Sequence, residues 1–246
     1  MTIDRLRLGT WNMLRDREDG QVRGQLEQLL TDNPGLHALA LQEVRDYHDV
    51  LRKVDGWNWY GLTDGPRGSD QNGWLVREDV QADRVTPMDL GGDGWTTVTG
   101  HHHVGAIAVG IRLETWLHGK SLHLPVSVDW RHGRPVGPPE RVDDYVTNMR
   151  HLMRYRLQHH PDAQSSLTMV RQRDRYGSDH PLVVFTVTRI GDQHGLLYVG
   201  DWNCRPGRDE GRFSVSWLGM HARMAVGKPP NAVGRLSGID LPVLAR

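Results

Sequence analysis

Five short segments of this 246-residue chain place a carboxylate, an amide or an imidazole at the beginning or end of an apolar run. These are the segments around Asn12 (TWN), Glu43 (QEV), His123 (LHLP), Asp179 and His180 (SDH), and Asp201 and Asn203 (GDWN). Strand ends are where α/β proteins usually place their chemistry. Carboxylate and amide oxygens bind hard divalent cations, and histidines exchange protons near neutral pH. Such residue types can hold a cation and move protons beside it.

Each segment also has an ordinary structural interpretation. Asn and Asp favour turns, so Asn12 can simply end a strand. Glu43 can equally be a surface charge, and His123, which lies between two leucines, can be a hydrogen-bonded core histidine. Only the combination of all five segments is specific enough to indicate a function.

The opening of the chain predicts a strand, a helix and a second strand. Residues 5–13 alternate apolar and polar side chains, which is typical of a strand. Residues 21–33 carry apolar side chains at helical spacing and end in an Asn-Pro-Gly turn. A short apolar run at 36–41 is predicted to be the second strand. This arrangement brings Asn12 and Glu43 to strand ends.

The rest of the chain predicts two more helices and several short strands. The helices are expected at 47–54 and at 140–160, where an apolar stripe has helical period. Strands are expected around 74–77, 104–113, 121–126, 167–171, 181–188 and 196–199. No linker forces a domain boundary, so we expect a single domain over residues 1–246.

The composition limits the classes of partner and compartment. Lys plus Arg number 30 and Asp plus Glu number 30, so no overall basic field attracts a polyanion and any nucleic-acid contact must be local. The single cysteine, Cys204, excludes an intramolecular disulfide and a multi-cysteine zinc site. No signal peptide is recognised, and no apolar stretch approaches the ~20 residues of a membrane helix. We therefore expect a cytoplasmic protein that does not enter a membrane.

Taken together, the five motifs resemble the endonuclease/exonuclease/phosphatase superfamily of metal-dependent phosphodiesterases and phosphatases. That superfamily includes pancreatic-type deoxyribonucleases and abasic-site endonucleases. The resemblance spans residues 10–240 and is weakest over 47–100. It implies an α/β (α+β) fold, a four-layer sandwich of two packed, mostly antiparallel sheets flanked by helices, with the active site at one edge. The implied activity is Mg²⁺- or Mn²⁺-dependent hydrolysis of phosphodiester bonds by a nuclease, with DNA as a possible substrate.

The resemblance implies the residues that hold the metal. Hydrolysis of a negatively charged phosphodiester needs a hard cation, a base for water and stabilisation of the leaving oxygen. Glu43 is the best metal ligand, with Asn12 beside it as an orienting or water-bridged amide. Asp179 supplies a further carboxylate near the ion.

The remaining motif residues are expected to act on water and phosphate. By resemblance, Asp201 polarises the attacking water, and Asn203 holds a phosphate oxygen or the base itself. His123 and His180 face the phosphate and donate hydrogen bonds to its oxygens. Asp240, in the segment GIDL, supports the leaving-group side.

The order of the motifs differs from that of the family. In relatives the SDH strand is the last one, whereas here residues 178–180 precede residues 200–203. Moving residues 163–193 to the end of the chain would restore the usual order. We therefore predict a rearranged connectivity after residue 162. The site can still assemble, because strand pairing depends on position in the sheet more than on chain order.

Two other functions remain open at this stage. The zero net charge weakens the case for a nonspecific nuclease and leaves a small-molecule or lipid phosphoesterase possible. A non-catalytic binding protein that keeps the fold is the other alternative, with Asp179 and His180 uncoupled from the site. The sequence gives no indication of the oligomeric state.

Overall fold

The computed structural model describes the first third of the chain almost continuously and the remainder mainly as strands. The described residues are 5–13, 18–44, 46–61, 72–82, 86–87, 105–112, 116–123, 128–131, 134–145, 147, 167–171, 183–188, 195–201, 204–206, 215–217, 220–222, 224–225 and 233–234. Beyond residue 105, side chains are described at only a few positions, including Ser121 and Tyr145.

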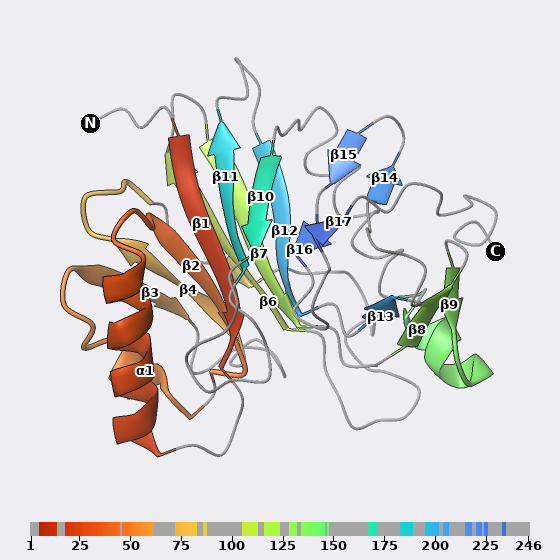
Figure 1. The fold of residues 1–246 in the computed structure, drawn as a ribbon, viewed down its shortest axis with the longest axis horizontal. Coiled ribbons are helices and arrows are strands. Elements are labelled where there is room, and N and C mark those ends of the chain that lie inside the picture. Colours follow the sequence, from red (N-terminus) through yellow and green to blue (C-terminus); the bar gives the residue numbers. More distant parts are fainter. Residues whose placement is uncertain are drawn as a thin grey trace.

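The largest sheet has six strands in the order β10-β11-β1-β2-β4-β3 (Figure 1). The strands are β1 (Arg5–Asn12), β2 (Ala38–Gln42), β3 (Trp57–Gly61), β4 (Asn72–Arg77), β10 (Leu167–Arg171) and β11 (Val183–Thr188). The β1–β2 pair is parallel and the other pairs are antiparallel. We call this sheet A.

A second sheet, sheet B, has the order β12-β7-β6-β5. Its strands are β5 (Thr86–Pro87), β6 (Gly105–Arg112), β7 (Trp116–His123) and β12 (Gly195–Asp201). The β12–β7 pair is parallel and the other two pairs are antiparallel.

Three smaller sheets complete the described strands. One sheet has three strands, β8 (Val128–Arg131), β9 (Arg134–Val136) and β13 (Cys204–Pro206). The two others are two-stranded and consist of β14 (Val215–Trp217) with β15 (Met220–Ala222) and β16 (Met224–Ala225) with β17 (Val233–Gly234).

Helix α1 (Asp19–Asp32) covers one face of sheet A (Figure 1). Its buried side chains join those of β1, β2 and β4 in one apolar cluster, which includes Leu26, Leu29, Trp11, Leu41 and Leu75. The short helix α2 (His48–Leu51) adds Leu51 to the same cluster. Of the helices that the structure describes, none is long and apolar enough to cross a membrane.

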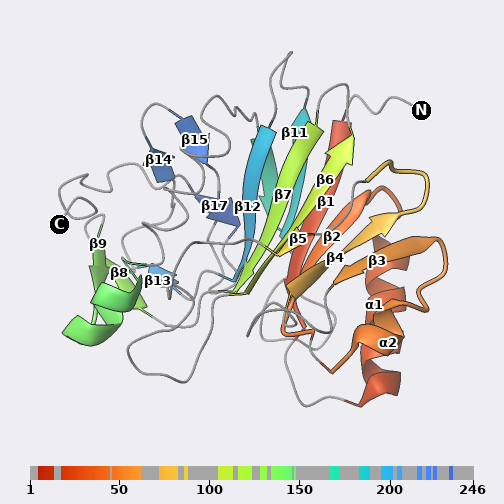
Figure 2. The ribbon, with the colours of Figure 1, turned by 180° about the vertical axis from the view of Figure 1, so that it is seen from behind.

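The opposite face of sheet A lies against sheet B, as the two opposite views show (Figures 1 and 2). Trp74 of β4 is fully buried at this contact. A Cβ placed on Gly119 of β7 would lie 2.9 Å from the Trp74 ring, closer than real Cβ atoms approach. The absence of a side chain at Gly119 therefore allows the two sheets to approach each other at this point.

The coarse fold class predicted from the sequence, α/β with helices and sheets, is confirmed, and each of the two large sheets contains one parallel pair. The predicted strands near residues 5–13, 36–41, 74–77, 104–113, 167–171, 181–188 and 196–199 are all present, with ends shifted by one to a few residues. The helix expected at 21–33 is present as α1.

Other predicted elements differ from the structure. The helix expected at 47–54 is reduced to the four residues of α2, after which the chain turns into β3, a strand that was not predicted. Strand β7 begins at Trp116, five residues before the expected start, and ends at His123. The helix expected at 140–160 is present over 139–145, and most of its remainder lies outside the described residues.

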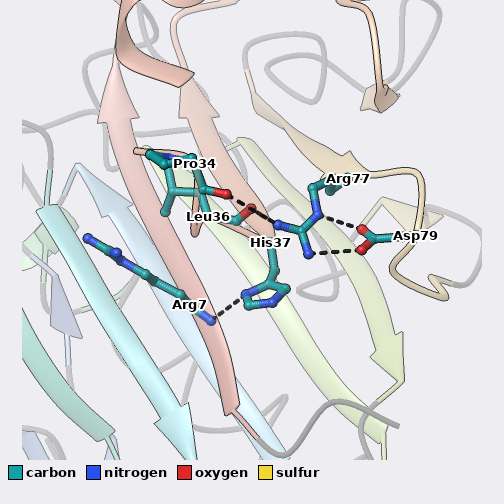
Figure 3. A network of polar contacts seen from close by, with 6 residues as sticks. All are labelled: Arg7, Pro34, Leu36, His37, Arg77 and Asp79. Atoms are coloured by element: carbon teal, nitrogen blue, oxygen red, sulfur yellow. Dashed lines mark hydrogen bonds and ion pairs between the residues drawn. The ribbon is translucent and has the colours of Figure 1, made fainter. Parts of the chain in front are cut away.

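A polar network joins three strands at the beginning of β2, opposite the strand ends that carry the motifs (Figure 3). The backbone N–H of Arg7 donates to Nδ1 of His37 at 3.0 Å. Arg77 contacts Asp79 through Nε and Nη2 and donates from Nη1 to the Leu36 carbonyl at 3.1 Å. Burial lowers the pKa of His37, and the positive charge of Arg77 lowers it further.

This network predicts a pH-dependent stability. Because the pKa of His37 in the folded protein lies below its unfolded value of 6.5, the unfolded chain binds more protons in acid. The contribution of neutral His37 to the free energy of unfolding is therefore fully present above pH 6.5. It is lost as the pH falls through the pKa of His37 in the folded protein. The variant His37→Gln, whose amide oxygen can still accept the Arg7 N–H, should lose less stability between pH 7.5 and pH 5.5. Urea unfolding at both pH values measures this, and equal losses in both proteins would contradict it.

Candidate active site

The strand ends of sheet A bring three amide side chains into one row. In the register of the sheet, Asn12 lies opposite Gln42, and Gln42 lies opposite Asn72. All three residues are buried, with at most 1% of their surface exposed. Glu43 follows Gln42 directly and is partly exposed. Two of the predicted site residues, Asn12 and Glu43, therefore lie side by side.

Sheet B has a corresponding row at the end of its own parallel pair. Asp201, the last residue of β12, lies opposite His123, the last residue of β7. His123 in turn lies opposite Gly105 of β6. Two residues predicted to act together, 78 positions apart in the sequence, are therefore neighbours in the backbone register.

Buried hydrogen bonds join the two rows. Gln42 Nε2 donates to Ser121 Oγ at 3.0 Å, and the Ser121 hydroxyl donates to the Leu41 carbonyl at 3.1 Å. Gln42 lies one residue before Glu43, and Ser121 lies two residues before His123. Because a strand rises about 3.3 Å per residue, both motif-bearing ends lie within a few ångströms along the strand of this contact. The two halves of the candidate site therefore share one end of the paired sheets.

Glu43 has an unusual backbone conformation, with φ at 59°. It is the one non-glycine residue with positive φ in the described part of the chain. This conformation costs an ordinary L-residue about 1–2 kcal/mol. Asn12 Nδ2 donates to Glu43 Oε1 at 3.0 Å and so fixes the direction of the carboxylate. A strained residue with an oriented carboxylate is typical of functional sites.

Strand β11 brings the segment that follows Asp179 and His180 in the sequence to the same end of sheet A. It runs antiparallel to β1, and its first residue, Val183, lies opposite Thr10. His180 precedes Val183 by three residues in the sequence, so β11 enters the sheet at the level of the Asn12 end of β1. Asp179 and His180 themselves lie outside the described residues.

The structure thus describes part of the predicted site. Asn203 and Asp240 lie outside the described residues, and for His123 and Asp201 only the backbone positions are described. Among the described side chains, no three of His, Cys, Asp and Glu gather as they would around a metal ion. The roles assigned to all eight residues from the sequence stay predictions.

The donor atoms at this end suit a hard cation. Glu43 offers a carboxylate held by Asn12, and the backbone register adds the position of Asp201 from the other sheet. Mg²⁺ and Mn²⁺ are bound by carboxylate, amide and water oxygens of this kind, and Mg²⁺ usually keeps several waters. The residues present therefore fit a divalent metal ion.

Sequence reasoning missed three polar residues at this end. Gln42 and Ser121 were assigned no role, although both are buried and bonded to each other. Asn72 is fully buried, and no described residue lies within hydrogen-bonding distance of its amide oxygen or nitrogen. A polar residue at the end of an apolar strand marks Gln42 and Asn72 in the sequence, whereas Ser121 lies inside β7 and has no such signal.

We predict that the backbone strain at Glu43 lowers stability independently of the charge on its carboxylate. Glu43→Gln and Glu43→Gly both remove the charge, but only glycine adopts positive φ without a steric penalty. Glu43→Gly should therefore be more stable than Glu43→Gln by about 1 kcal/mol, after allowance for the lost contact with Asn12. Urea unfolding of both variants measures the difference. A Glu43→Gly protein much less stable than Glu43→Gln would show that the backbone is not strained.

Asn72 gives a second prediction, because an unpaired buried amide costs about 1–3 kcal/mol. Replacement by an apolar residue of similar size, Asn72→Val, should raise the free energy of unfolding by an amount in this range. The matched control is Asn33, a buried asparagine whose Nδ2 donates to the Leu29 carbonyl at 2.8 Å. Asn33→Val should lower stability. A loss of stability in both variants would indicate that Asn72 has a partner.

Comparison with known families matches residues 9–240 to the family model described as the Endonuclease/Exonuclease/phosphatase family. The match covers all five motifs and the segment that carries Asp240. A search of curated proteins gives no match.

Solved structures resemble the fold. A humanized D. rerio TDP2 carrying 14 mutations is 12% identical, and the alignment covers 76% of this chain and 100% of that one with a TM-score of 0.55. TDP2 from C. elegans is 11% identical, with 75% of each chain covered and a TM-score of 0.50. At these identities the likeness concerns the fold.

Proposed function

The chain belongs to the Endonuclease/Exonuclease/phosphatase family, whose members hydrolyse phosphoesters, and on that premise we propose that it is a nuclease dependent on Mg²⁺ or Mn²⁺. The observation that carries the proposal is the meeting of two strand-end rows. Asn12 and Glu43 lie at the end of one parallel pair, and His123 and Asp201 lie at the end of the other. The hydrogen bond between Gln42 and Ser121 holds both ends at one edge.

The same proposal includes the complete architecture and its connectivity. Helix α1 on one face of sheet A and sheet B on the other account for three layers of a four-layer sandwich. The fourth would be a helical layer on the outer face of sheet B. All elements would form one domain over residues 1–246, with the connectivity after residue 162 rearranged.

The metal ion would be held at the Glu43 end of sheet A. Glu43 would be its main ligand, Asn12 would orient the Glu43 carboxylate through the 3.0 Å contact, and Asp179 would supply a further carboxylate. When bound, such an ion polarises a phosphate oxygen and offsets the negative charge that develops during hydrolysis.

The remaining residues would act on water, phosphate and leaving group. Asp201, at the end of β12, would take a proton from the attacking water, and Asn203 would position Asp201 or a phosphate oxygen. His123 and His180 would donate hydrogen bonds to the phosphate from opposite sheets. Asp240 would support the departing oxygen.

Nucleic acid is the substrate we favour, because the family description names endonucleases and exonucleases beside phosphatases. A small-molecule or lipid phosphoester is the alternative, and the zero net charge favours it. A binding protein that has lost catalysis is the third possibility. The single cysteine, Cys204, is compatible with the cytoplasm, which we propose as its compartment.

We expect the protein to cleave plasmid DNA or a generic aryl phosphodiester in Mg²⁺ or Mn²⁺ and to lose this activity with a chelator. Glu43→Gln should abolish the metal-dependent cleavage. Asp201→Asn keeps the size and removes the charge, and it should lower turnover by about 10²–10⁴-fold if Asp201 is the base.

The matched control is Glu27→Gln, a carboxylate exposed on α1, which should leave turnover unchanged. The two substrates separate nuclease from small-ester activity. A folded wild-type protein that leaves both substrates intact in either metal would contradict the proposal and favour the binding protein.

A further inference from the structure

A buried polar contact between the two sheets has no role in the proposed chemistry. Gln42 Nε2 contacts Ser121 Oγ at 3.0 Å and Thr10 Oγ1 at 3.2 Å, and the Thr10 hydroxyl lies 3.4 Å from Gln42 Oε1. The Ser121 hydroxyl then donates to the Leu41 carbonyl. All three side chains are at least 98% buried. We call Thr10, Gln42 and Ser121 the intersheet clamp.

A structural role alone does not require polar residues at these positions. The surrounding contact is apolar, since Trp74 lies over Gly119 one position further along the alternation of β7. Apolar residues of the same shapes can replace a buried hydrogen-bonded set with little change in stability. Apolar packing is not directional, so it allows the two sheets to slide against each other. Hydrogen bonds weaken steeply with distance and angle and therefore oppose such sliding.

The clamp lies where a small slide would matter most. It joins the residue next to Glu43 to the residue two positions before His123, which lies opposite Asp201. The two sheets carry different halves of the candidate site, so any change in their separation changes the distance between the halves. A displacement of about 1 Å at a reacting centre can cost on the order of 10²-fold in rate.

Resting on the proposed function, we propose that Gln42 and Ser121 are positioning residues that set the separation between the Asn12–Glu43 half and the His123–Asp201 half of the active site. Thr10 supports them by fixing the Gln42 amide. None of the three contacts substrate in this scheme, because all are enclosed between the sheets.

The test is a variant that removes the hydrogen bonds of the intersheet clamp but keeps the volume of its side chains and the apolar packing around them. Thr10→Val, Gln42→Met and Ser121→Ala are combined, so that none of the three side chains is left with an unpaired polar group, and only the Leu41 carbonyl loses a donor. This triple variant should unfold in urea at or near the wild-type midpoint. Its kcat should fall by about 10–10²-fold, with KM changed by less than about threefold, because misplacement acts on the reacting centre.

A control separates positioning from loss of stability. Val22→Ala removes apolar contact on the helical face of sheet A, remote from the clamp, and should lower the urea midpoint. Its kcat should match that of wild type under conditions where both proteins are folded. A triple variant with wild-type kcat and a stable fold would overturn the proposal. So would a Val22→Ala protein that loses kcat as strongly as the triple variant.

A second readout does not depend on activity. In protein labelled with 5-fluorotryptophan, the Trp74 fluorine resonance, assigned with Trp74→Phe, reports the contact between the sheets. The triple variant should shift or broaden the Trp74 resonance and leave that of Trp59, on β3, unchanged. Suppose that the wild-type protein cleaves no ester while the Trp74 resonance still changes in the triple variant. In that case the clamp sets the separation between the two sheets, and only the proposed function fails. An unchanged Trp74 resonance overturns the clamp itself.

Discussion

A set of buried hydrogen bonds between the two sheets fixes how their strand ends meet. Apolar faces alone would allow several alignments of similar energy, whereas Gln42, Thr10 and Ser121 find partners in one of them. Each buried polar group left unpaired would cost about 1–3 kcal/mol. Three such groups would offset a large part of the ~5–15 kcal/mol that stabilises an ordinary domain. The alignment that satisfies them is also the one that brings Glu43 and His123 to the same edge.

Local sequence patterns were enough to predict eight of the ten strands of sheets A and B and the neighbouring positions of Asn12 and Glu43. Alternation marked β1, and the helical spacing of Val22, Leu26 and Leu29 marked α1, because side chains return to the same face every two residues in a strand and about every 3.6 residues in a helix. Asn12 and Glu43 were assigned to neighbouring strand ends, and the structure shows their side chains in contact. Those inferences used residues that are close in sequence or belong to one strand–helix–strand unit.

What the sequence did not predict depends on partners that are distant in the chain. Nothing near Gln42 indicates that its amide meets Ser121, which is 79 residues away, and an isolated glutamine is usually exposed. The positive φ of Glu43 also has no local signal, because glycine or asparagine would be the usual residue there. The early start of β7 at Trp116 reflects its pairing with β6 and β12 along nearly its whole length, which the residues at 116–120 do not indicate by themselves.

The order of the motifs, with residues 178–180 before residues 200–203, is compatible with this fold for a geometric reason. The last residue of β11, Thr188, lies opposite Arg5 at the start of β1, and the first residue of β12, Gly195, lies opposite Leu117 near the start of β7. Both positions are remote from the site, at the opposite end of the strands. Seven residue steps separate Thr188 from Gly195 and reach at most about 25 Å, whereas packed sheets lie about 10 Å apart. A chain can therefore pass from sheet A to sheet B at this end without disturbing the edge where the motifs meet.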